Sequence, residues 1–163
     1  SEQYDIFDIV KLSKANSCLG INTDIKFLKN TDINLFAQIN NNNVEMNLYL
    51  KKINECELIN NKKLYQINGD STNISLVNIT SKIFFNTGID IIIINCKNNY
   101  IEDFINFKSA INSNGVVFFK NPPKDIQKII QFNNFKEIGF TYDFSDENDD
   151  ILINFGFSIQ KYY

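Results

Sequence analysis

Three short apolar runs in the middle of the chain constrain its fold more than any other feature. The runs are Leu64–Ile67, Ile89–Ile94 and Val116–Phe119. The second run is almost wholly β-branched, as a strand that is buried on both faces requires. The segments between the runs carry apolar residues at helical spacing: Ile74, Val77, Ile83 and Phe84 in the first, and Ile101, Phe104, Ile105 and Ile111 in the second. Because parallel strands linked by covering helices bury such a pattern most simply, the sequence predicts an α/β fold.

The N-terminal part of the chain predicts further helices and strands. The expected elements are a helix over Tyr4–Ser13, a strand over Cys18–Ile21, a helix that begins at Asp24 or at Thr31 with Ile33, Phe36 and Ala37 on its inner face, a strand over Val44–Leu50, and a polar connection over Lys51–Asn61. The Val44–Leu50 segment alternates apolar and polar residues, which is typical of a strand with one solvated face.

The C-terminal part predicts a helix and a β-hairpin. Pro122 and Pro123 can open the helix, and Ile126, Ile129 and Ile130 would give it an apolar face. The last two strands are expected over Phe135–Phe144 and Ile151–Ile159, joined by an acidic hairpin loop over Ser145–Asp150. The sheet would thus have seven strands, and one strand of the hairpin must run antiparallel to the rest.

Composition limits the size and the chemistry of the protein. At 163 residues and 44% hydrophobic, the chain can bury roughly 70% of its unfolded surface in one core, so we expect a single domain over residues 1–163. The chain has no histidine. This excludes Ser-His-Asp and Cys-His nucleophiles, His-liganded zinc and an imidazole base. Cys18, Cys56 and Cys96 are far apart and odd in number, which is typical of free thiols.

Charge and hydropathy bear on partners and location. The formal charge is −3, and the Lys residues are scattered rather than clustered, so nucleic acid is not an expected partner. No apolar run approaches the roughly 20 residues that a membrane helix needs, so no membrane span is expected. The N-terminal segment SEQYDIFDIV is acidic and amphipathic, unlike a signal peptide. These features predict a cytoplasmic protein.

Several motifs resemble those of the class I S-adenosylmethionine-dependent methyltransferases. Gly69-Asp70-Ser71 resembles the Gly-Asp pair that ends the third strand in that family, and Ile89–Ile94 resembles its fourth strand. Ser113–Phe119 is similar to its fifth strand, with Asn114 in place of a glycine. Asn95–Tyr100 lies where one small-molecule branch has Asp-Gly-x-His-Ser-Tyr, of which the Tyr is present. The resemblance extends over about residues 4–161.

The resemblance implies a fold, a cofactor and a set of site residues. The fold would be a Rossmann-like, three-layer αβα sandwich with a seven-stranded, mostly parallel sheet and a C-terminal antiparallel hairpin. The cofactor would be S-adenosylmethionine, bound in the crevice beyond the carboxyl ends of the strands. The residues expected to line that crevice are Gly20, Asn22, Asp70, Ser71 and Asn95.

The chain also departs from the family pattern. In the segment Cys18–Asp24 a single Gly replaces the family's Gly-rich turn, although Asn22 is suited to the positive φ that such a turn needs. No clear acidic residue follows the second strand to hold the ribose, and Glu55 is a weak candidate. Asn95 and Lys120-Asn121 stand where metal-dependent members carry carboxylates. No metal is therefore expected, and the chain is interpreted as a degenerate member.

The sequence leaves competing functions open. One is a methyltransferase acting on a small molecule, and another is a methyltransferase-like domain without cofactor that binds a protein partner or assembles with it. A nicotinamide-dependent oxidoreductase is disfavoured because the GxGxxG fingerprint is missing. At the residue level, Asp70 can merely cap a turn, Gly20 can relieve a tight turn, and Tyr100 can pack as an ordinary aromatic.

Overall fold

The computed structural model describes residues 4–25, 28, 31–41, 49–53, 62–97, 99–132, 134–147 and 150–162. The elements in chain order are β1 (Tyr4–Asp5), α1 (Ile6–Ser13), β2 (Ser17–Ile21), β3 (Leu35–Asn40), β4 (Tyr49–Ile53), β5 (Lys63–Asn68), α2 (Ile74–Ile83), β6 (Ile89–Asn95), α3 (Tyr100–Phe107), the 3-10 helix η3 (Lys108–Ala110), β7 (Ile111–Lys120), the 3-10 helix η4 (Ile126–Gln131), β8 (Phe135–Glu147) and β9 (Asp150–Lys161).

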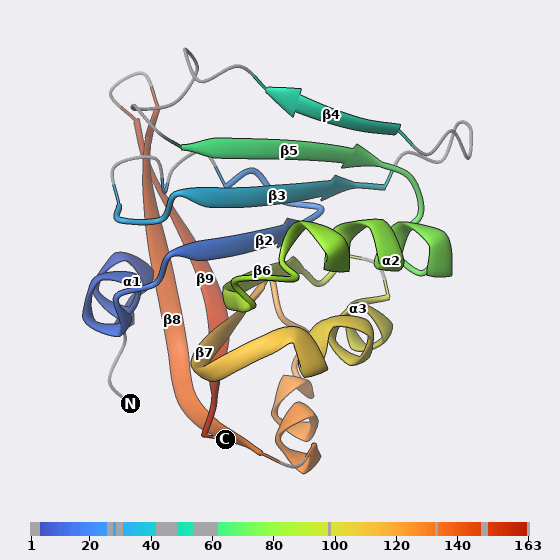
Figure 1. Cartoon of the computed structure of the whole chain (residues 1–163). Helices are drawn as coiled ribbons and strands as arrows, with labels where there is room; N and C mark the ends of the chain where they lie inside the picture. Colours follow the sequence, from blue (N-terminus) through green and yellow to red (C-terminus); the bar gives the residue numbers. More distant parts are fainter. Residues whose placement is uncertain are drawn as a thin grey trace.

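All the described strands belong to one sheet. Its order is β1-β8-β9-β7-β6-β2-β3-β5-β4, and Figure 1 labels the strands β2 to β9. Strands β7, β6, β2, β3 and β5 run parallel to one another, whereas β9 is antiparallel to both of its neighbours and β4 is antiparallel to β5. From β2 the chain moves outward to β3 and β5, then returns to the other side of β2 with β6. The order of the strands therefore reverses between β2 and β6.

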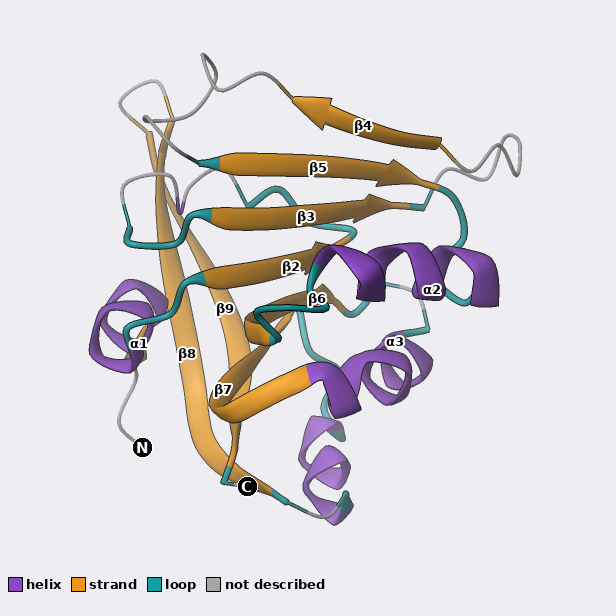
Figure 2. Cartoon of the chain, in the orientation of Figure 1, coloured by secondary structure: helices purple, strands orange, loops and turns teal. Residues whose placement is uncertain are grey.

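Helices cover both faces of this sheet. On one face α2, α3 and η4 bury Leu76, Phe104 and Ile129 against the strands. On the other face α1 buries Ile6 and Val10. The helices, purple in Figure 2, thus form the outer layers of a sandwich. The predicted α/β class, the mostly parallel sheet and the C-terminal hairpin are confirmed. The sheet also contains β1 and β3, which the sequence did not predict as strands.

The second parallel strand differs from the prediction. We expected a helix with Ile33, Phe36 and Ala37 on its inner face, but Leu35–Asn40 is strand β3. Phe36 packs in the core on the α1 side, while Ala37 packs on the α2 side. Because β3 is paired on both edges and covered on both faces, its apolar residues need not alternate. Their spacing then fits a helix equally well.

The bounds of other helices and strands also differ from the prediction. Of the strand expected over Val44–Leu50, residues 44–48 lie outside the described residues. Tyr49 and Leu50 begin the edge strand β4, which continues to Ile53 through part of the expected polar connection. Ile111 opens β7 instead of extending the preceding helix. The helix after the prolines is the 3-10 helix η4, and β8 continues through Ser145 to Glu147.

Helix α2 is fixed at its start by a side-chain cap. The Asn73 Oδ1 accepts hydrogen bonds from the backbone N–H of Ser75 at 2.9 Å and of Leu76 at 3.4 Å. These bonds satisfy donors that the first turn of a helix leaves free. The cap therefore sets where the β5–α2 connection ends, and that connection carries two of the predicted site residues, Asp70 and Ser71.

Candidate functional site

The predicted site lies at the carboxyl edge of the sheet, beside the reversal of strand order. The arrowheads of β2, β3 and β5 point to this edge in Figure 2. Open α/β sheets bind ligands at such a switch point because the loops on its two sides diverge and leave a crevice. Asn22, Asn41, Ser71 and Asn95 lie at this edge, each at or just beyond the end of a strand.

Asn22 ends β2 in the left-handed conformation that the sequence indicated, with φ 56°. Its backbone N–H donates to the Ile39 carbonyl at 2.8 Å. Its side-chain Oδ1 accepts from the backbone N–H of Asn41 at 2.8 Å. This bond fixes the orientation of the amide. The Asn22 Nδ2 is then left buried, with no hydrogen-bond partner in the described part of the chain.

Asn95 joins the end of β6 to the end of β2. Its Nδ2 donates to the Asn22 carbonyl at 3.2 Å, and its Oδ1 accepts from the backbone N–H of Lys97 at 3.3 Å. The side chain therefore links the two strands between which the order reverses. The sequence named both Asn22 and Asn95, and the structure brings them together.

Ser71 is held by Asn41 through two hydrogen bonds. The Asn41 Nδ2 donates to the Ser71 Oγ at 3.0 Å, while the Asn41 Oδ1 accepts from the Ser71 N–H at 2.7 Å. Ser71 is 1% exposed. Because Asn41 also donates its own N–H to the Asn22 Oδ1, the three residues Ser71, Asn41 and Asn22 form one connected network at this edge of the sheet.

Asp70 and Gly20 take structural positions. The exposed Asp70 accepts from the Thr72 N–H at 2.9 Å and from the Thr72 Oγ1 at 2.7 Å, so its carboxylate closes the turn before α2. Gly20 lies inside β2, where a Cβ would meet the Ile25 Cγ2 at 2.5 Å. The space that Gly20 leaves open is filled by Ile25.

The sequence missed a row of amides at this edge. The Gln38 Nε2 donates to the Asn40 Oδ1 at 3.2 Å, and the Asn40 Nδ2 donates to the Asn68 Oδ1 at 3.3 Å. Asn40, at the end of the second parallel strand, stands where the family pattern led us to look for an acid. Glu55, the weak candidate for that role, lies outside the described residues. The signal in the sequence was the run of Asn residues that begins at Asn40.

The sequence also missed Asp103. This residue of α3 is fully buried, at 0% exposed, and neither of its carboxylate oxygens has a hydrogen-bond partner among the described residues. Burial raises the pKa of Asp103 to about 6, against which the nearby Ser71 hydroxyl acts in the opposite direction. A hint in the sequence was its position three residues after Tyr100 and one before Phe104, on the apolar side of the helix.

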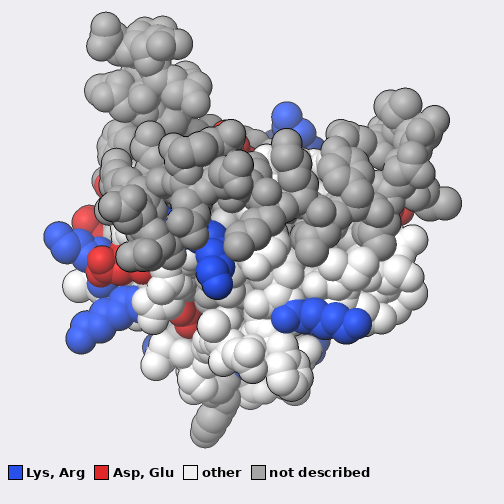
Figure 3. Space-filling view, turned by 45° about the horizontal axis from the view of Figure 1, so that its top comes forward, with Lys and Arg blue, Asp and Glu red and all other residues white. Residues whose placement is uncertain are grey.

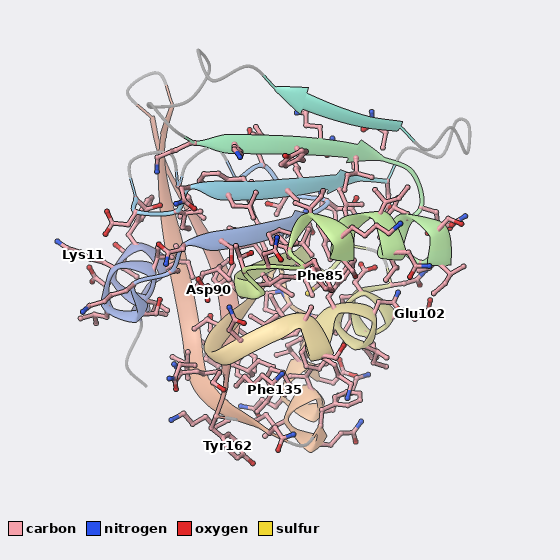
Figure 4. All side chains as sticks on the ribbon, viewed as in Figure 1. Lys11, Phe85, Asp90, Glu102, Phe135 and Tyr162 are labelled. Carbon is pink, nitrogen blue, oxygen red and sulfur yellow. The ribbon has the colours of Figure 1, made fainter. Side chains whose placement is uncertain are left out.

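Asp90 and Tyr100 have ordinary structural roles. Asp90 lies at the opposite edge of the sheet, where it accepts from the Asn16 N–H at 2.8 Å and from the Asn112 Nδ2 at 2.9 Å. Figure 4 shows Asp90 and Glu102 on opposite sides of the molecule. The Tyr100 ring packs edge-on against Phe119, with ring centroids 6.1 Å apart.

The thiols and acids of the described residues form no metal cluster. Burial raises the pKa of the Cys18 thiol and raises that of Cys96 to about 12, so both are neutral thiols at physiological pH. Within the residues that the structure describes, no group of three or more Cys, Asp or Glu side chains is placed to hold a metal ion. No helix in that part of the chain is both long and apolar enough to cross a membrane.

Comparison with known proteins gives no relative by sequence. No family model matches the chain, and no curated protein does either. Several solved structures share its fold. An O-methyltransferase from Bacillus cereus in complex with SAH is 12% identical with a TM-score of 0.58, over 96% of this chain and 79% of that one. N-methyltransferase NodS from Bradyrhizobium japonicum WM9 is 8% identical with a TM-score of 0.54, over 97% and 93% of the two chains.

A methyltransferase from Geobacter sulfurreducens shows the same likeness, at 10% identity and a TM-score of 0.53 over 93% of this chain and 76% of that one. Identities this low establish the fold alone. The chain therefore has the Rossmann-like fold that these methyltransferase structures share.

Proposed function

We propose that this protein binds S-adenosylmethionine in the crevice at the carboxyl edge of the sheet and transfers its methyl group to a small molecule. The proposal rests on the conformation and the unpartnered donor of Asn22. Asn22 takes the left-handed conformation at the switch point, and its buried Nδ2 donor has no partner among the described residues. A buried donor without an acceptor is costly, and a ligand acceptor atom would satisfy it.

The residues at this edge fit the cofactor. The amino-acid end and the ribose of S-adenosylmethionine offer carboxylate and hydroxyl oxygens that the Asn22 Nδ2 can reach as a donor. The amide of Asn40 replaces the acidic residue of the family pattern, and an amide oxygen can accept from a hydroxyl as a carboxylate does. The amides of Asn22 and Asn40 are polar and uncharged, and hydrogen bonds from them would hold the ligand.

The chemistry asks little of the protein itself. The bound cofactor supplies an activated methyl group on a sulfonium. The chain must then bind the acceptor in line with that group, orient it and exclude water. Such a reaction does not depend on an imidazole base, and the absence of histidine is compatible with it.

We propose that the reaction needs no metal and involves no nucleic acid. Asn95 and Asn121 offer neutral amides where metal-dependent relatives carry carboxylates, and hard divalent ions prefer carboxylate ligands. On the face drawn in Figure 3 the described Lys side chains (blue) stand among acidic (red) and uncharged (white) residues. That mixture favours a small acceptor over a polyanion.

Titration calorimetry with S-adenosylmethionine and S-adenosylhomocysteine tests the proposal. We expect micromolar binding of both to the wild-type protein, and at least about tenfold weaker binding to Asn22→Asp, which replaces the free donor with an acceptor. The matched control is Asn114→Asp, the same change at another left-handed Asn, φ 67°, that is exposed and lies in β7 outside the site. Its affinity should equal that of the wild type.

The same titration distinguishes the proposed function from the alternative. No heat and no thermal shift with millimolar S-adenosylhomocysteine would contradict the proposal. The chain would then be a methyltransferase-like module that binds or assembles with a protein partner.

A further inference from the structure

The sequence contains two Asn-Gly pairs, Asn68-Gly69 and Asn114-Gly115. In such a pair the backbone nitrogen of the glycine can attack the side-chain carbon Cγ of the asparagine and close a ring. Glycine permits this reaction because it has no side chain to shield its nitrogen and its φ is not restricted. In a folded protein the reaction then depends on how firmly hydrogen bonds hold the groups that must move.

The fold holds the first pair, Asn68-Gly69, at both reacting groups. The Gly69 N–H donates to the Asn40 carbonyl at 3.0 Å, and the Asn68 Oδ1 accepts from the Asn40 Nδ2 at 3.3 Å. The first bond engages the hydrogen that the attacking nitrogen must lose, and the second fixes the amide that it must attack. Both bonds must break before the ring can close, so the folded protein protects this pair.

The second pair lies in an irregular part of β7. The register of β7 with β6 shifts between Ile89 and Ile91, and the pairing of β7 with β9 begins only at Val116. Residues 112–115 thus have no partner residue in the described register of either neighbouring strand. Asn114 lies in this bulge, exposed and in the left-handed conformation with φ 67°.

The side chain of Gln160 restrains the peptide between Asn114 and Gly115. Its Nε2 donates to the Asn114 carbonyl at 3.0 Å, at the surface of the protein. The Asn114 side-chain amide makes no hydrogen bond to another described residue. In the left-handed conformation the nitrogen of the next residue points away from the side chain, so the ring closes only after the peptide rotates and the bond from Gln160 breaks.

Packing explains why a glycine follows Asn114. A Cβ on Gly115 would meet the Ile111 Cγ2 at 2.5 Å and the Asn112 carbonyl oxygen at 2.8 Å. The bulge therefore favours both members of the pair: an asparagine, which tolerates a positive φ, and after it a residue without a side chain.

Two other asparagines in similar surroundings each lack one requirement of the reaction. Asn112 lies in the same bulge, but its Nδ2 donates to the Thr87 carbonyl at 2.8 Å and to the Asp90 Oδ1 at 2.9 Å, which holds its amide. Asn121 is exposed and left-handed, with φ 53°. It precedes Pro122, whose nitrogen has no hydrogen to lose.

We propose that Asn114-Gly115 is a site of spontaneous deamidation in the folded protein. The Gly115 nitrogen loses its proton and bonds to the Asn114 Cγ. The Cγ–Nδ2 bond breaks, and Nδ2 takes up a proton and leaves as ammonia. Water then adds to either carbonyl of the cyclic imide and opens it to aspartate or isoaspartate, each of which adds one negative charge to the formal −3. The reaction needs only water, and the inference is independent of the proposed function.

Peptide mass spectrometry after incubation of the folded protein at mildly alkaline pH tests the inference. Deamidation should be at least about tenfold faster at Asn114 than at Asn68, because both reacting groups of the latter pair are held. The control is the same protein unfolded in urea, where the two pairs should react at similar rates. Equal rates in the folded protein, or faster reaction at Asn68, would overturn the inference.

A substitution at Gln160 tests the restraint on the peptide. Gln160→Leu removes the donor to the Asn114 carbonyl and should speed deamidation of Asn114 by about fivefold. The rate at Asn68 in the same variant is the internal control and should not change, whereas general loosening of the fold would raise it. Reaction at Asn114 that is no faster in this variant than in the wild type would contradict the proposed rotation of the peptide.

Discussion

Two buried ionisable residues, Lys62 and Asp103, differ in whether hydrogen-bond partners compensate for their burial. Lys62 is 7% exposed, and its Nζ donates to the carbonyls of Thr31 and Ile33 while lying 5.8 Å from the centre of the Phe36 ring. Burial lowers its pKa, and the charge of Asp32 opposes this. Asp103 has no comparable partner among the described residues. Lys62 is thus compensated by the loop that it holds in place, whereas Asp103 is not.

The stability of the protein should therefore depend on the ionisation of Asp103. Its pKa in the folded state, about 6, lies above the ordinary value of 3.8. The folded state thus binds the proton more tightly than the unfolded state, and stability is lost as the pH rises from about 4 to about 6. At pH 8 the loss is about 3 kcal/mol. Asp103→Asn should raise the free energy of unfolding at pH 8 by a similar amount and have little effect near pH 4.

Urea unfolding of both proteins at several pH values checks this. The exposed Glu102→Gln serves as the control and should follow the wild type throughout. If the free energies of unfolding of Asp103→Asn and the wild type differed by the same amount at every pH, the ionisation of Asp103 would not affect stability, and the expectation would be wrong.

The β8–β9 hairpin packs closely against the parallel strand β7 at a glycine. Gly156 of β9 lies between Lys120 of β7 and Thr141 of β8 in the sheet. A Cβ at this position would meet the Phe118 Cζ at 2.4 Å and the Phe119 carbonyl oxygen at 2.7 Å. The close approach of β9 to β7 thus depends on the missing side chain.

Gly156→Ala should destabilise the protein by about 1–3 kcal/mol, because a tightly packed interior accommodates an extra methyl group only by moving the ring or the backbone. Thermal unfolding measures the loss. Phe118→Leu in the same background should remove part of the penalty, and a double-mutant cycle gives the coupling. Additive effects of the two substitutions would contradict the contact.

The sequence predicted an element well where its residue pattern fits only one type of secondary structure. Ile89–Ile94 is too short for a typical helix and too apolar for a loop, and it is the central strand β6. Leu35–Asn40 was mistaken for a helix because a strand buried on both faces has no alternation, and only pairing with β2 and β5 resolves the ambiguity. Strand β4 was partly missed because an edge strand tolerates polar residues such as Lys51 and Lys52.

The site was predictable where backbone geometry dictates the residue type. The left-handed turn at Asn22 follows from its place after a strand, and the structure confirms it. Asn41 was missed along with β3, since its role depends on where that strand ends. Asp103 follows Glu102 in sequence and resembles a surface acid; only the packing of α3 shows that it points inward.

Strand β9 holds the parallel strands and the β1–β8 pair together in one sheet. It pairs with β7 on one edge and with β8 on the other, and β1, at the N-terminal end of the described chain, pairs with β8. Phe157 and Ile159 of β9 are buried in the core beneath α3 and η4. Within the sheet, β1 is therefore joined to the parallel strands through the two strands of the hairpin.

A chain truncated after residue 149 should fail to fold. It would lose the β9 partner of both β7 and β8, together with two fully buried side chains, at a cost of about 3–6 kcal/mol for those side chains alone. Circular dichroism and proteolysis check this, and deletion of the exposed Tyr162 and the residue after it is the control. A truncated chain with a cooperative unfolding transition would contradict the expectation.

The position of β9 also has a consequence during translation. Every other strand of the sheet leaves the ribosome before it, yet it must enter between two of them. A nascent chain that still lacks β9 exposes the edges of β7 and β8, which are open to pairing with other polypeptides. Chaperones that bind extended segments should therefore engage the nascent chain after β8 has emerged and release it once β9 has paired with β7 and β8.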